Sequence, residues 1–144
     1  MAHPSDTIRA KVVSLIKFGG TSAGQRVYDS RTQVSEADDL PNVVVFTDSD
    51  QVVEWQAMNG TMNRRTGLRI ECRIKHNNEA SGAQALGNLR REVELILDGD
   101  RDLDGTALYG ELGDTEIEWN DDSDPPVILA KIDFFAVYLD DFSA

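Results

Sequence analysis

The most regular pattern of hydrophobic and polar positions lies near the C-terminus, between Pro125 and Leu139. Every second residue of this run is apolar: Ile128, Ala130, Ile132, Phe134, Ala136 and Tyr138. Because successive side chains of a strand point to opposite faces of a sheet, this run predicts a long strand with one face in a core. At about 3.3 Å per residue it would span roughly 40 Å, enough to cross a whole sheet and extend beyond it.

Two other segments have the period of an amphipathic helix. The first is residues 6–18, with Ser5 as the expected N-cap and Gly19-Gly20 as the stop. The second is expected to begin at a capping box, Ser81–Gln84, and to end near Asp98-Gly99. Its apolar face consists of Leu86, Leu89, Val93, Ile96 and Leu97.

Shorter runs predict the remaining strands. Arg26–Asp29 is expected to be a short edge strand. Asn42–Phe46 is apolar almost throughout, which is typical of a strand covered on both faces, here by a helix or by a neighbouring subunit. After an expected polar turn at Thr47–Asp50, the run Gln51–Ala57 resumes a weak strand pattern.

The order of elements indicates the fold class. Leu68–Lys75 alternates almost perfectly, and we expect it to pair antiparallel with Gln51–Ala57. Thr115–Trp119 forms another short strand before the C-terminal one. This order predicts an α+β fold, a mostly antiparallel β-sheet with two helices packed on it. The length of 144 residues and the lack of a linker predict one domain over residues 1–144.

The connection Met58–Gly67 is longer than a tight hairpin needs, and long loops in small domains are often functional. It contains two methionines and two arginines, residue types that are favoured at protein contacts. We therefore expect a partner contact at Met58, Met62, Arg64 and Arg65.

The net charge of −12 disfavours sequence-specific DNA binding, because phosphate contacts need concentrated Lys and Arg. Eleven of the 26 acidic residues lie between Asp98 and Asp124, with Arg101 as the one basic residue among them. Five of these acidic-loop residues also match the calcium loop of an EF-hand: Asp100, Asp102, Asp104, Gly105 and Glu111. A calcium-binding module using residues 100–111 is thus one alternative. A solvated loop is the other, since β-like residues follow where a second helix should be.

The sequence offers no convincing catalytic or cofactor site. Cys72 alternates inward with apolar neighbours and is expected to be a buried structural thiol. His3 and His76 are too few and too far apart in sequence to indicate a zinc site. We expect a protein without enzymatic activity, cofactor, metal or membrane segment, present in a reducing cytoplasm or in a particle assembled there.

The C-terminal third resembles the closing strand pair of the tail terminator family of long-tailed phages. The resemblance is carried by Gly113-Asp114-Thr115-Glu116-Ile117-Glu118, an acidic turn, and Pro126-Val127 through Ala130-Lys131-Ile132, Phe134 and Val137-Tyr138. It extends more loosely to the helix from Ile8, to Arg26–Asp29, to Leu40–Phe46 and to the helix before Asp98.

This resemblance implies a structural virion protein that forms a ring, typically of six copies, on the head-proximal end of a finished tail tube. The ring would stop polymerisation of the tail tube protein and present a joining surface to the head–tail connector. DNA would pass through it without sequence-specific binding, and Asp98, Asp100, Asp102 and Asp104 are candidates for lining that channel. The alternative within the same particle is another neck or head-completion connector subunit.

Overall fold

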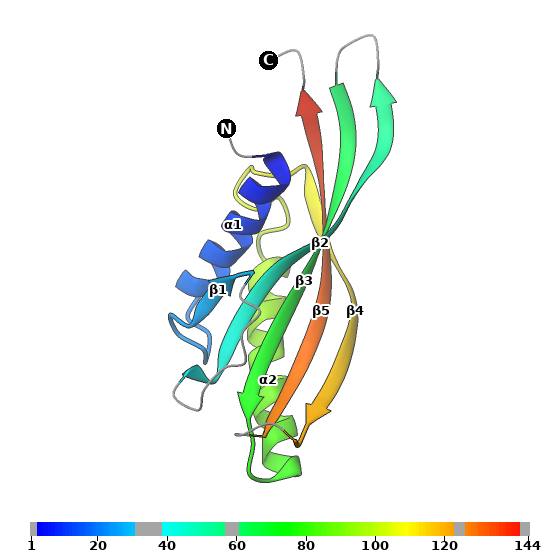
Figure 1. Cartoon of the computed structure of the whole chain (residues 1–144). Coiled ribbons are helices and arrows are strands. Elements are labelled where there is room, and N and C mark those ends of the chain that lie inside the picture. The colour runs from blue at the N-terminus through cyan, green and yellow to red at the C-terminus, as the bar shows by residue number, and fades with distance from the viewer. Residues whose placement is uncertain (1–2, 31–38, 57–60, 123–125, 142–144) are drawn as a thin grey trace.

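The computed structural model describes residues 3–30, 39–56, 61–122 and 126–141. They form a five-stranded sheet and two helices that lie on one face of it (Figure 1). The elements are α1 (Pro4–Phe18), β1 (Val27–Asp29), β2 (Asn42–Gln56), β3 (Thr61–Lys75), α2 (Glu79–Asp98), β4 (Tyr109–Asn120) and β5 (Val127–Asp141). The strand order is β1-β2-β3-β5-β4, with β1 parallel to β2 and the other pairs antiparallel. The predicted fold class is confirmed.

The strand β5 organises the sheet, because it pairs with β3 along its whole length and with β4 along most of it. Its side chains alternate between buried and partly buried from Ile128 to Tyr138. The prediction of a long C-terminal strand is confirmed, since β5 has 15 residues and continues past the first residue of β4, Tyr109. Phe134 on this strand is one of the largest fully buried side chains.

The helix α1 begins earlier than predicted. His3 is the N-cap, and its Nδ1 accepts a hydrogen bond from the backbone N–H of Ser5 over 3.1 Å. Pro4 suits the first helical position because the N–H that proline lacks would have no partner there. Ser5 is therefore a buried residue inside the helix, and its prediction as the cap was wrong. The expected stop at Gly19 is confirmed.

The helix α2 also begins upstream of its predicted cap. Asn78 is the N-cap, and its Oδ1 accepts hydrogen bonds from the N–H groups of Ala80 and Ser81. The predicted capping box at Ser81 was wrong, because Asn78 caps the helix and Ser81 lies inside its first turn. The apolar face is confirmed in its buried members, Leu86, Leu89, Val93 and Leu97.

The strands β2 and β3 are much longer than predicted. The expected turn at Thr47–Asp50 is wrong, since β2 runs continuously through it with two register shifts. The expected loop Met58–Gly67 is wrong from Thr61 onward, where β3 begins. The expected pairing of Leu68–Lys75 with Gln51–Ala57 is also wrong: Asn42–Thr47 pairs with Leu68–Arg73, whereas Gln51–Gln56 pairs with Thr61–Arg65. Polar side chains misled the prediction because these strand segments lie outside the core.

The strand β4 begins at Tyr109, six residues before the predicted Thr115. The acidic character of its first half suggested a loop, but its backbone pairs with β5 on both sides of an irregularity between Leu112 and Thr115. An acidic edge strand, rather than an acidic loop, therefore occupies much of the region after α2.

Both faces of the sheet are buried at Val43–Val45, each 0% exposed. Val43 and Val45 join the helices in the core, whereas Val44 lies on the opposite face beside Tyr28 and Glu71 of the adjacent strands. The expected cover by a helix or a second subunit is wrong for this face, because the single chain already buries Val44. We refer to the face opposite the helices as the open face.

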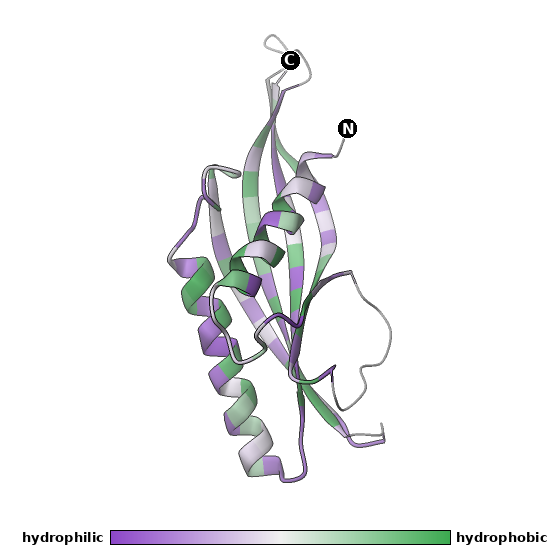
Figure 2. Cartoon of the chain, turned by 90° about the vertical axis from the view of Figure 1, so that its left-hand side faces the viewer, coloured by the Kyte–Doolittle hydropathy of each residue, from purple (hydrophilic) through white to green (hydrophobic). Residues whose placement is uncertain are grey.

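The two helices pack closely against each other as well as against the sheet. A Cβ atom at Gly19 would lie 2.4 Å from Cδ1 of Ile96 and 2.8 Å from the backbone oxygen of Leu15, so the end of α1 lies against α2 and the backbone contact favours glycine there. Figure 2 shows α1 and α2 in front of the strands, with hydrophobic and hydrophilic residues alternating along the sheet. None of the described helices is long and apolar enough to span a membrane.

Candidate functional site

The most distinctive part of the molecule is a three-stranded extension of the sheet past the ends of the helices (Figure 1). We define it as the tongue: residues 51–56 of β2, 61–65 of β3 and 137–141 of β5. Each of its residues on β3 has a strand partner on both sides. The tongue is thus a continuous part of the sheet that extends beyond the ends of the helices (Figure 1).

The outer edges of the tongue are open among the described residues. The strand β1 pairs with Val43–Val45 only, and β4 begins opposite Val137 and runs away from the tongue. Three aliphatic side chains of the tongue, Val52, Val53 and Leu139, are between 49% and 59% exposed. Exposed aliphatic residues next to free strand edges are the features that a protein partner can use.

A polar cluster ties the three strands together at the base of the tongue. Arg64 Nη2 lies 2.6 Å from Asp50 Oδ2, and its Nη1 lies 3.4 Å from Asp140 Oδ2. The hydroxyl of Tyr138 donates to Asp50 Oδ1 over 2.9 Å. The cluster pairs the two terminal nitrogens of one guanidinium with carboxylates from different strands, while its Nε is buried without a hydrogen-bond partner. These pairs favour one register of β2, β3 and β5 relative to one another.

Burial and mutual contacts shift the pKa values of Tyr138 and Arg64 in this cluster. Tyr138 and Asp140 are buried, and the side chains of Arg64 and Asp50 are 20% and 18% exposed. Burial raises the pKa of Tyr138, and its hydrogen bond to Asp50 raises it further. Burial alone would lower the pKa of Arg64, but Tyr138 and Asp50 raise it by more. At neutral pH the cluster therefore contains a cation, two nearby carboxyl groups and a neutral phenol.

The structure places the predicted contact residues on different faces of the tongue. Met58 lies outside the described residues. Met62 and Arg64 share the face of Tyr138, and Arg64 is held in the polar cluster. Arg65 lies on the open face, with its guanidinium 3.9 Å from the ring centroid of Phe135. Strand alternation thus leaves Arg65 available to a partner, whereas Arg64 has a structural role.

The four acidic residues proposed to line a channel lie at the end of α2 and in the turn that follows. Asp98 pairs with Arg101 at 2.6 Å, and Asp104 pairs with Lys11 of α1 at 3.1 Å. Asp98, Asp102 and Asp104 are exposed and Asp100 is partly buried. They therefore belong to the helical layer and not to the open face of the sheet.

The geometry of this turn gives the calcium alternative no support. Asp100 Oδ1 accepts a hydrogen bond from the backbone N–H of Asp104 over 2.8 Å, which closes the turn locally. Glu111, the last residue of the motif, lies in β4 with a distant ion pair to Arg65. No group of three or more His, Cys, Asp or Glu side chains suited to a metal ion occurs in the described part of the chain.

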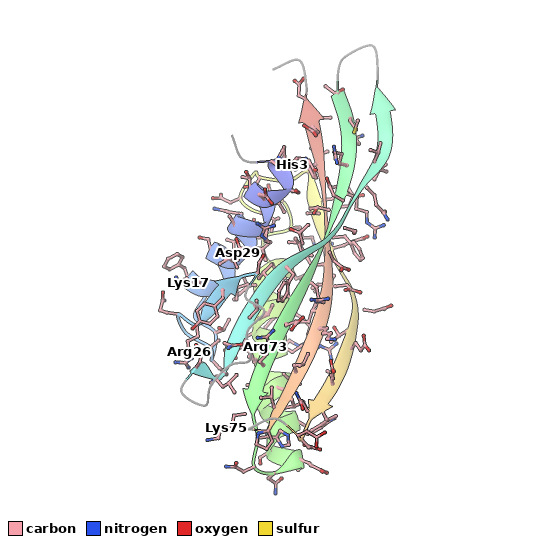
Figure 3. All side chains as sticks on the ribbon, in the orientation of Figure 1. His3, Lys17, Arg26, Asp29, Arg73 and Lys75 are labelled. Carbon is pink, nitrogen blue, oxygen red and sulfur yellow. The ribbon has the colours of Figure 1, made fainter. Side chains whose placement is uncertain are left out.

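The open face carries charge of opposite sign on different strands. On β3 the basic side chains are Arg65, Arg69, Arg73 and Lys75, and on β4 the acidic ones are Glu111, Glu116 and Glu118. Glu71 lies 2.8 Å from both Arg69 and Arg73 and balances part of the basic row. Lys131 of β5 pairs with Glu118 at 2.9 Å, which raises the pKa of Lys131. Figure 3 labels Arg73 and Lys75 of the basic row, in the second half of β3.

Cys72 and His76 are both buried. Cys72 is fully buried, and burial raises its pKa to about 12, so the reactive thiolate is scarce at neutral pH. This confirms the predicted buried thiol. His76 is also buried, with its ring edge-on to Trp119 and its Nε2 3.2 Å from Asp121 Oδ1.

Sequence reasoning did not identify the cluster partners Asp50, Tyr138 and Asp140. Tyr138 was assigned to the apolar row of β5, and Asp50 to a turn. The available signal was Asp140, which occupies a core-facing position of the alternation and so needs a cationic neighbour. Finding Arg64 as that neighbour required the register of β3 against β5.

Comparisons with known proteins do not assign the chain to a family. No protein-family model matches the chain, and no curated protein matches it. A chain from a solved structure described as "Virion of native gene transfer agent (GTA) particle" is similar, with a TM-score of 0.37 and 11% sequence identity. The match covers 90% of this chain and 84% of that chain. Similarity at this level does not decide between functions.

Proposed function

We propose that this protein is a structural virion component that caps the head-proximal end of a phage tail tube. A ring of copies, six in the family that the sequence resembles, stops addition of further tail tube protein and joins the tail to the head. In this proposal the protein is not an enzyme, uses no cofactor, and is assembled in the host cytoplasm into the tail or neck of the particle.

The observation that carries the proposal is the tongue. A tube-capping subunit needs a rigid surface that reaches beyond its own body to the last ring of the tube. The tongue has that form, and the polar cluster of Arg64, Asp50, Asp140 and Tyr138 holds its three strands in register. Its exposed aliphatic residues give the contact an apolar component.

Within the proposal, the tube contact uses the open face and edges of the tongue. Arg65 stays a candidate together with Val53 and Leu139, whereas Arg64 supports them from the base. Met62 stays a candidate at the tip, next to residues outside the described part of the chain. A double replacement of both arginines would confuse contact with stability, so Arg65→Glu alone is the informative change.

The channel proposal concerns Asp98, Asp100, Asp102 and Asp104. If the helical layer faces the channel, these carboxylates repel DNA and let it pass without binding. If the open face lines the channel instead, the acidic row of β4 takes this role and the four aspartates lie outside. A structure of the assembled ring separates these arrangements directly.

The experiment that tests the function is electron microscopy of particles from a producer in which this reading frame is interrupted early. Tubes much longer than normal, with heads unattached, are the expected result. Tails of normal length beside unattached heads would instead assign the chain to the connector side of the neck. Intact, infectious particles would contradict both roles.

A further inference from the structure

Two exposed patches on opposite edges of the molecule have complementary chemistry. The first is on β4, the last strand of the sheet, whose outer edge has no strand partner in the described ranges. Ile117 and Trp119 are 44% and 43% exposed at this edge, although their strand partners on β5 are buried in the core. Glu116 and Glu118 alternate with them on the open face. We define these four residues as the acidic edge.

The second patch is at the C-terminal end of α1. Phe18 is 74% exposed, which is unusual for an aromatic residue at a helix end that already has a glycine stop. Lys17 precedes it and has no ion-pair partner in the described part of the chain. Arg26 lies on the same side of the molecule (Figure 3). Lys17 and Arg26 are both partly buried, and Arg26 Nε donates to the backbone oxygen of Pro41 over 2.9 Å, which leaves its two terminal nitrogens for a partner. We define Lys17, Phe18 and Arg26 as the basic corner.

The fold places these patches at opposite ends of the sheet. The helix α1 packs on β1 and β2, at one end of the strand order, and β4 is the other end. A contact between them within one chain is therefore excluded. A second copy can bring its basic corner against the acidic edge of the first. The pair then retains one unused patch of each kind, the corner of the first copy and the edge of the second.

We propose that the acidic edge of one copy binds the basic corner of the next copy in a head-to-tail contact. Phe18 packs on Ile117 and Trp119 from the neighbour, while Lys17 and Arg26 approach Glu116 and also Glu118, which keeps its ion pair with Lys131 of its own chain. The charge pattern favours this contact over a symmetric dimer that joins two acidic edges, because such a dimer would place like charges together. A contact between two different patches repeats around a closed ring, as the proposed function requires.

The contact would also cover the free edge of β4, which could otherwise pair with strands of other chains. Free strand edges with exposed apolar residues tend to pair with other chains without control. The carboxylates of Glu116 and Glu118 restrict that pairing to a partner with basic residues, and the chain itself supplies one. The biological meaning of the contact rests on the proposed ring, but its existence is testable without a tail.

The test is sedimentation velocity of the purified full chain over a range of concentrations. Two variants each remove one patch: Phe18→Glu for the corner, and Glu116→Lys with Glu118→Lys for the edge. The wild type is expected to form species larger than a dimer, and each variant should associate at least tenfold more weakly. Arg91→Glu, a charge reversal at an exposed residue of α2, is the matched control and should assemble like the wild type.

An equimolar mixture of the two variants gives the decisive result. One intact edge and one intact corner remain in the mixture, so it should form a dimer and stop there. A monomeric wild type at every concentration, variants that assemble normally, or a mixture that stays monomeric would each overturn the contact. The role in tails is judged separately, since overlong tubes from the interrupted reading frame would support capping even if the purified chain sediments as a monomer.

Discussion

The sheet has two regions built on different principles. We call the part of the sheet that α1 and α2 cover the body. There Ile70, Cys72, Ile132 and Phe134 of β3 and β5 belong to the core cluster shared with the helices, and burial of apolar surface holds the strands together. In the tongue the same strands continue without helices, and a cluster of Arg64 with two carboxylates replaces the apolar core. We therefore expect stability and partner contact to depend on different residues: the body stabilises the fold, and the tongue presents the proposed contact surface.

The largest effect is expected in the body. Phe134→Ala removes one of the largest fully buried side chains and leaves a cavity under α2, which should lower the free energy of unfolding by about 4 kcal/mol. Urea denaturation followed by circular dichroism measures this loss. A loss below about 1 kcal/mol would contradict the claim that the body carries the stability.

Loss of the cation at the base of the tongue should have the next largest effect. Arg64→Ala leaves Asp50 and Asp140 without their counter-charge. Breaking a buried ion pair lowers the free energy of unfolding by about 3 to 5 kcal/mol, and we expect about 3 kcal/mol because this pair is partly exposed. Hydrogen exchange should show the loosening mainly in residues 51–56, 61–65 and 137–141. Adding Asp50→Asn and Asp140→Asn should recover part of the loss, and no recovery would show that charge is not the cause.

Removal of the phenol should have a smaller effect with a distinct pH dependence. Tyr138→Phe loses the hydrogen bond to Asp50 and should cost about 1 kcal/mol at neutral pH. Because folding raises the pKa of Tyr138, the native state favours the protonated phenol. That contribution is complete below the unfolded pKa and is lost as pH rises through the folded pKa.

The free energy of unfolding, measured between pH 9 and 12, should therefore change differently in the wild type and in Tyr138→Phe. The wild type should lose stability more steeply above about pH 10, the ordinary tyrosine pKa, than Tyr138→Phe does. Cys72 also titrates in this range but is common to both chains, so it does not affect the difference. Parallel pH profiles would rule out a buried, neutral phenol in the cluster.

The smallest effect on stability is expected for Arg65, directly next to Arg64 in the sequence. Arg65→Ala removes a cation from the ring of Phe135 and a weak pair with Glu111, which together should cost less than about 1 kcal/mol. Comparison with Arg64→Ala under identical denaturation conditions isolates the effect of the face on which each arginine lies. Equal losses would refute the assignment of a structural role to Arg64 alone.

The sequence predicted the body better than the tongue for a physical reason. In β5 and α2 the spacing of apolar residues indicates which side faces the core, so the sequence predicted both the strand and the buried face of the helix. Residues 47–50 and 61–67 are strands because they pair with neighbouring backbone, and pairing leaves no period when the outer faces are polar. Turn-like composition therefore concealed the strand structure.

The same limit applies to the candidate site. Met62 and Arg65 were found through residue types that favour protein contacts, and this works for exposed residues. The cluster of Asp50, Arg64, Tyr138 and Asp140 joins residues up to 90 positions apart, and it exists only in one register of three strands. A single sequence does not contain that register.

The most direct test of the account is electron microscopy of particles from a producer whose chain carries Val53→Asp and Leu139→Asp. Both residues are exposed, so the body should fold normally, and urea denaturation of the purified variant checks this. Leu95→Asp, at an exposed leucine of α2, is the matched control outside the tongue. The account predicts overlong tubes and unattached heads for the tongue variant and normal particles for the control. Normal tail lengths with a folded tongue variant would contradict the claim that the tongue contacts the tube.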